Sequence, residues 1–65
     1  MSSVKEVADR MFEYRTKLKI RHPSTPLYTV EFAYLNGQFL ERLHVLTPEG
    51  IEFLDKCKEY LREHI

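Results

Sequence analysis

The chain has 65 residues, 43% of them apolar and 31% charged, and its ten Lys and Arg residues balance ten Asp and Glu residues. This composition is typical of a folded domain and excludes an intrinsically disordered chain, while the neutral charge gives no support to a strongly basic nucleic-acid binder. The single cysteine, Cys57, excludes an intramolecular disulfide.

The absence of long apolar runs bears on location. No uncharged run approaches the roughly 20 residues that span a bilayer, and the first ten residues lack the apolar core of a secretory signal. We therefore expect one small domain over residues 1–65, in the cytoplasm and without a membrane segment. A domain this short buries a small core, so self-association is one expected source of additional stability.

The first predicted element is a helix over residues 4–17. Ser3 and Glu6 have the spacing of a capping box, and apolar residues follow at helical spacing. These apolar residues are Val4, Val7, Met11, Tyr14 and Leu18. Residues 17–21 then alternate polar and apolar side chains, as a short third strand would.

The central segment predicts a β-hairpin. Residues 27–35 are rich in aromatic and β-branched side chains, and Asn36-Gly37 is the strongest short-range signal for a two-residue turn. Pairing Leu35 with Gln38 fixes the register of the two strands. The resulting opposite pairs are Tyr34 with Phe39, Val30 with Leu43, Tyr28 with Val45 and Glu31 with Arg42.

The last predicted element is a helix that starts at Thr47-Pro48, since threonine is a good N-cap and proline suits the first helical position. Apolar residues cover about half of its circumference. They are Ile51, Phe53, Leu54, Cys57, Tyr60, Leu61 and Ile65. The predicted fold class is therefore α+β, in the order α-β-β-α, with a central antiparallel β-hairpin packed on two helices.

Surplus apolar surface predicts a protein interface. The second face of the hairpin is apolar, and the apolar face of the last helix is wider than is needed to pack on one hairpin. The candidate interface residues are Leu27, Ala33, Leu35, Leu40, Leu46, Phe53, Cys57 and Tyr60. We expect the chain to form a homodimer, and the alternative is that it binds an unidentified second protein.

A family resemblance concerns the stretch FLERLHVLTPEGIEFLDKCKEYL, Phe39 to Leu61. It resembles the wing strand and following helix of MarR- and PadR-type winged-helix regulators, whose form L-T-x-x-G-x-x-x-L is matched by Leu46, Thr47, Gly50 and Leu54. The resemblance implies that the hairpin is a wing. The recognition helix that precedes the wing in that family is absent here, and helix capping also explains the Leu-Thr-Pro-Glu-Gly segment.

A basic cluster gives the nucleic-acid interpretation its candidate contacts, because positive side chains suffice to bind phosphates. These residues are Arg15, Lys17, Lys19 and Arg21, with Arg42 as an extension. The alternative, which we favour, is a solvated helix end whose cations complement the helix dipole.

No motif predicts catalysis, a cofactor or a metal site. Cys57 and His64 lie about two helical turns apart, too far to bind one zinc ion, and no nucleophile–base motif or glycine-rich phosphate loop occurs. We therefore expect a small non-enzymatic binding or regulatory module that acts through protein contacts and self-association. The alternatives are a winged-helix-like regulator associated with nucleic acid and a small phage or mobile-element inhibitor of a host protein.

Overall fold

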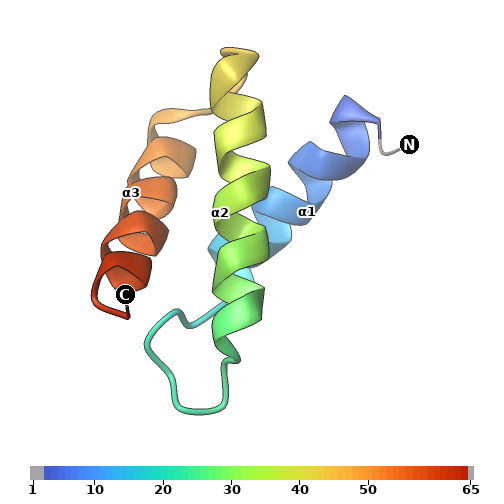
Figure 1. Ribbon diagram of the computed structural model, residues 1–65. Helices are drawn as coiled ribbons and strands as arrows, with labels where there is room; N and C mark the ends of the chain where they lie inside the picture. Colours follow the sequence, from blue (N-terminus) through green and yellow to red (C-terminus); the bar gives the residue numbers. More distant parts are fainter. Residues whose placement is uncertain (1–2, 65) are drawn as a thin grey trace.

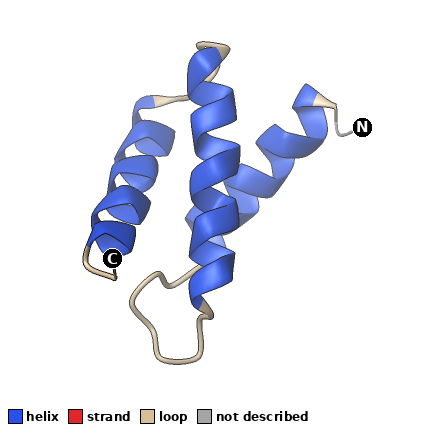
Figure 2. Cartoon of the chain, in the orientation of Figure 1, coloured by secondary structure: helices blue, strands red, loops and turns tan. Residues whose placement is uncertain are grey.

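The computed structural model describes residues 3–64, and this part of the chain forms three α-helices and no strand (Figures 1 and 2). They are α1 (Val4–Lys17), α2 (Leu27–Arg42) and α3 (Pro48–Arg62). Figure 1 shows α2 running antiparallel to α3, with α1 crossing α2 obliquely; α2 packs against both other helices, which contact each other less. The predicted α+β fold is therefore wrong, and the fold is all-α.

The predicted bounds and N-cap of α1 are confirmed. The Ser3 hydroxyl accepts a hydrogen bond from the backbone N–H of Glu6 at 3.1 Å, which satisfies one of the free donors of the first turn. The helix ends at Lys17, and Leu18 is extended. The predicted third strand near Leu18–Arg21 does not form, because residues 18–26 close on themselves: the Thr25 hydroxyl donates to the Lys19 carbonyl at 2.7 Å.

The α2 helix replaces the predicted hairpin. Its buried residues Val30, Ala33, Gly37 and Leu40 are spaced by three and four positions, so they form one row that faces α1 and α3. A helical period can bury this row against two helices at once, whereas a hairpin would have divided it between strands. The predicted strand pairs Tyr34–Phe39, Val30–Leu43, Tyr28–Val45 and Glu31–Arg42 are consequently all wrong, since all but Val45, which follows α2, lie within this helix or at its C-cap.

Gly37 marks a close approach between helices and not a turn. A Cβ atom at this position would lie 2.6 Å from Cδ1 of Leu54 and 3.0 Å from Cε of Met11. Both of those side chains are buried in the core. The glycine of the Asn36-Gly37 signal therefore lets α2 approach α1 and α3, which explains why a turn signal lies in the interior of a helix.

The C-terminal end of α2 has the hydrogen-bond pattern of a Schellman motif. The backbone N–H of His44 donates to the carbonyl of Glu41 at 3.0 Å, and that of Val45 donates to the carbonyl of Leu40 at 3.3 Å. His44 has a φ of 57°, the left-handed conformation that glycine usually adopts at this position. This motif ends α2 and turns the chain towards α3.

The α3 helix begins as predicted. The Thr47 hydroxyl accepts a hydrogen bond from the backbone N–H of Gly50 at 3.1 Å, and Pro48 occupies the first helical turn. Of its predicted apolar residues, Ile51 is exposed; Ile65 lies outside the described residues. All three helices contribute to one core: Met11, Val30, Ala33, Leu40, Phe53, Leu54 and Cys57.

We predict that Gly37→Ala lowers the free energy of unfolding by about 1 kcal/mol. The added methyl group should improve helix propensity by about 1 kcal/mol, but displacing Leu54 and Met11 costs about 1–3 kcal/mol. Urea denaturation followed by circular dichroism measures the change. Asn36→Ala is the control, and we expect it to be neutral or slightly stabilising. A Gly37→Ala protein more stable than the parent would contradict the close approach.

We predict that His44→Gly raises the free energy of unfolding by about 0.5–1 kcal/mol, because glycine adopts a positive φ without the steric penalty of a Cβ atom. The matched variant His44→Ala removes the imidazole but keeps the Cβ atom, so it should not be stabilised. Thermal unfolding of the three proteins distinguishes them. A His44→Gly protein that melts below His44→Ala would show that the left-handed conformation carries no strain.

Candidate functional site

The exposed face of α2 carries a continuous row of large apolar side chains. Tyr28, Phe32, Leu35, Phe39 and Leu43 follow one another in steps of four, three, four and four residues. At about 100° per residue these positions fall within an arc of about 80° along the whole helix and its C-cap. Their exposed fractions are 63%, 57%, 57%, 42% and 42%. We call these five residues the α2 stripe.

The α2 stripe lies opposite the buried row of the same helix. The mean direction of Val30, Ala33, Gly37 and Leu40 is about 140° away from that of the stripe around the helix axis. A helix that is apolar on two sides is usually buried on both. Here α1 and α3 cover one side, and the other side faces solvent.

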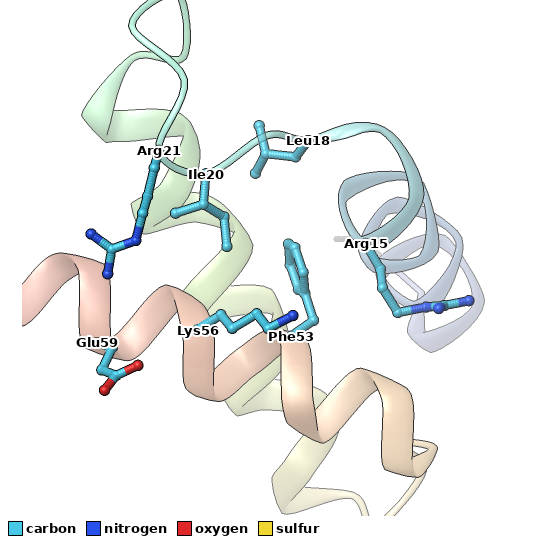
Figure 3. A pocket seen from close by; sticks show the side chains of 7 residues that line it. All are labelled: Arg15, Leu18, Ile20, Arg21, Phe53, Lys56 and Glu59. Carbon is cyan, nitrogen blue, oxygen red and sulfur yellow. The ribbon is translucent and has the colours of Figure 1, made fainter.

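A second candidate is a groove of about 420 Å³ between the end of α1, the following connector and α3 (Figure 3). Leu18, Ile20 and Phe53 supply apolar side chains to it, and charged residues surround them. The charged lining residues are Arg15, Arg21, Lys56 and Glu59. The groove thus combines an apolar surface with three cations and one anion.

The cations of this groove already have partners. Arg21 forms a bidentate ion pair with Glu63, and its guanidinium carbon lies 5.3 Å from the centre of the Tyr60 ring. Arg15 lies over the Phe12 ring, and Figure 3 shows its guanidinium pointing away from the other labelled side chains. Lys56 lies 3.5 Å from a carboxylate oxygen of Glu52. The groove therefore does not direct several cations towards one ligand.

The Arg21–Glu63 pair also sets the local electrostatics. Its hydrogen bonds hold the pKa of the Glu63 carboxyl below its ordinary value and the pKa of Arg21 above its own. Both side chains are about half exposed, so solvent screens the pair and its contribution to stability is small. Its main effect is positional, since it ties the connector after α1 to the end of α3.

Cys57 is buried in the core with no exposed surface, and burial raises the pKa of its thiol from 9.0 to about 11. The thiol is therefore protonated at neutral pH. A protonated buried thiol is a poor nucleophile and a poor metal ligand, so Cys57 is a core residue.

The predicted nucleic-acid contacts divide into separate places. Arg15 and Arg21 line the groove of Figure 3, and Lys17 and Lys19 line a neighbouring shallow groove of about 240 Å³. Arg42 ends α2, and that end lies at the opposite side of the bundle from the connector after α1 (Figure 1). The fold thus gathers four of the five cations and separates Arg42 from them.

The predicted protein-interface residues also divide. Four of them belong to the core: Ala33, Leu40, Phe53 and Cys57. Leu46 and Tyr60 are half-buried against that core. Only Leu27 and Leu35 of this set are exposed, and Leu35 lies at the centre of the α2 stripe.

The other four members of the α2 stripe were missed as interface residues. The predicted hairpin places Tyr28, Phe32, Phe39 and Leu43 on the strand face that packs on the two helices, and so in the core. The spacing of four and three residues from Tyr28 to Phe39 was present in the sequence and is the signal that finds them.

Neither a metal site nor a membrane span emerges from residues 3–64. Within them, no three His, Cys, Asp or Glu side chains are placed to bind a metal ion. None of the helices described combines the length and apolar character needed to cross a membrane.

Comparison with known proteins gives no relative: no protein-family model, no curated protein and no solved structure matches this chain.

We predict that the buried thiol makes the stability depend on pH in the alkaline range. The folded state raises the Cys57 pKa from 9.0 to about 11, so it disfavours the thiolate. The resulting stabilisation of folded relative to unfolded protein is complete below pH 9 and is lost as the pH rises to about 11. A pKa difference of two units corresponds to a loss of about 2–3 kcal/mol in the free energy of unfolding.

Urea unfolding at a series of pH values measures this loss, with Cys57→Ala as the matched variant. Lysine and tyrosine titration is common to both proteins and cancels in the comparison. We expect the parent protein to lose more stability than Cys57→Ala between pH 9 and 11. Equal losses would show that the Cys57 thiol ionises without penalty in the folded state.

Proposed function

We propose that this chain is a small protein-binding module and that the α2 stripe is its contact surface. The observation that carries the proposal is the continuous exposure of five large apolar side chains on one helix face. Each exposes on the order of 100 Å², because about half of its surface is accessible to solvent. The stripe therefore amounts to about 500 Å², within the range of about 300–600 Å² at which the largest apolar patch of a soluble monomer is often functional.

The chemistry of the stripe fits a protein partner. Tyr28, Phe32 and Phe39 are aromatic, and aromatic side chains are enriched at protein interfaces because they bury large areas with little loss of conformational entropy. The stripe residues lie on a regular helix whose other side is fixed in the core, so little ordering is needed when a partner binds. An amphipathic partner helix is the simplest complement of such a face.

A binding role, as opposed to a catalytic one, is supported by the contacts of the reactive side chains. Cys57 is a buried, protonated thiol. His22 contacts the Ser24 hydroxyl at 2.6 Å, and the His64 ring contacts the Tyr60 carbonyl at 2.8 Å. These groups make local structural contacts, which favours a regulatory module without enzymatic activity. We further infer a cytoplasmic location, since free thiols are typical of reducing compartments.

Nucleic-acid binding stays a prediction that we do not favour. Arg15, Lys17, Lys19 and Arg21 gather near the end of α1, but Glu59 and Glu63 lie beside Arg21 and reduce the positive potential there. Phosphate binding depends on several cations that act together. An inhibitor of a larger host protein remains compatible with the proposal, because such an inhibitor would use the same kind of apolar face.

Site-specific photo-crosslinking in cells that produce the chain tests the proposed surface. A benzophenone amino acid replaces Phe32 or Phe39 of the stripe, or Ile51 of α3 as the control. Ile51 is exposed to the same 42% as Phe39, but lies on another helix. We expect protein adducts from positions 32 and 39 and none from position 51.

A second substitution on the stripe sharpens this experiment. Leu35→Glu introduces a charge at the centre of the stripe and should abolish the adducts from position 39, while Ile51→Glu should leave them unchanged. The proposal fails when neither stripe position gives a protein adduct, or when position 51 gives the same adducts.

A further inference from the structure

We propose that the occupant of the α2 stripe is the α2 stripe of a second copy of this chain, packed antiparallel about a two-fold axis. This inference rests on the proposed function and names its partner. It follows from the charges beside the stripe, from the way the apolar residues match, and from the area that such a dimer buries.

The charge argument concerns Glu31 and Arg42. Both are exposed, and their positions around the helix differ by only about 20°, so they lie along the same edge of the α2 stripe. They are eleven residues apart in the sequence, or about 16 Å along the axis. Within residues 3–64, neither forms an ion pair; those present join Lys5 to Asp9, Arg21 to Glu63, and Lys56 to Glu52.

A two-fold axis midway between positions 31 and 42 brings these charges together. In an antiparallel pair of helices, the same edge of each helix faces its counterpart in the other copy. Glu31 of each copy then lies opposite Arg42 of the other, which gives two identical ion pairs per dimer.

The same register also matches the apolar residues. Near the axis, Leu35 of one copy lies beside Phe39 of the other, and one turn farther out Phe32 lies beside Leu43. These two pairings agree with the Glu31–Arg42 register to within about two residues, or about 3 Å of helix rise. One register therefore satisfies both the charges and the apolar contacts.

A parallel dimer lacks this agreement. In a parallel coiled coil, Phe32 and Phe39 would occupy the a positions of successive heptads. Glu31 of one copy would then lie opposite Asn36 of the other. No charge pair forms in that arrangement. The charges beside the stripe thus favour the antiparallel orientation.

The area and the overall charge are also compatible with a dimer. The stripe supplies about 500 Å² per copy, and the stems of Glu31 and Arg42 bring the total to about 600–700 Å², at the lower end of the roughly 600–1,000 Å² per partner of a standard interface. The formal net charge of the chain is zero at pH 7. Two copies therefore approach each other without net repulsion.

Sedimentation equilibrium over the micromolar to millimolar range tests the dimer. We expect the purified chain to reach twice the monomer mass, and Phe32→Glu to raise the dissociation constant by about a hundredfold or more, since the side chain contributes twice to a symmetric interface. Ile51→Glu on α3 is the control and should leave the constant unchanged. Circular dichroism verifies that each variant keeps its helices.

Charge reversal tests the orientation. Glu31→Arg alone and Arg42→Glu alone should each raise the dissociation constant by about threefold to tenfold, because each replaces two attractive contacts by two repulsive ones. The double variant Glu31→Arg/Arg42→Glu restores opposite charges in the antiparallel register. Its constant should return to within about twofold of the parent value at low salt.

The outcomes separate this inference from the proposed function. A chain that stays monomeric at millimolar concentration, while its stripe crosslinks to another protein in cells, overturns the dimer and leaves the protein-binding proposal standing. A dimer whose double charge reversal is no tighter than the single variants overturns the antiparallel register. A monomer without stripe adducts overturns both proposals.

Discussion

The close approach of α2 to α1 and α3 at Gly37 is the constraint on which the rest of the bundle depends. No side chain separates the α2 backbone from Leu54 and Met11 at this point. Because α2 lies so close, a core of few residues from three helices can be nearly free of solvent, with Val30, Ala33 and Cys57 fully buried. The core of a chain of this size is small, so the distance between the helices decides whether it closes.

The starts of α1 and α3 were predictable because their signals are local. Ser3 and Thr47 cap helices through contacts with residues three positions away, and such contacts depend on no other part of the fold. The segment around Asn36-Gly37 was not predictable in this way. Its turn signal is also local, but the contacts that overrule it join Gly37 to residues of two other helices, and a single sequence does not reveal which helices meet.

The exposed apolar face of α2 was not predicted because the same segment was predicted to be a hairpin. Once residues 27–46 were assigned a two-residue period, the aromatic residues Tyr28 and Phe32 fell on the predicted core face, while Ala33 and Leu40 fell on the outer face. A 3.6-residue period exchanges these roles. The opposite charges of Glu31 and Arg42 match across the predicted hairpin, but on a helix the same spacing places both residues along one edge.

The opposition of the two α2 faces has a consequence for how the sequence can change. Phe32 and Leu35 are exposed on the side of α2 opposite the buried residues Gly37 and Leu40, and substitutions at well-separated sites have nearly additive effects. Variation of the outer face can therefore change the chemistry of this surface with little effect on the packing of the bundle. Variation of the inner face alters the stability and leaves the side chains of the α2 stripe unchanged.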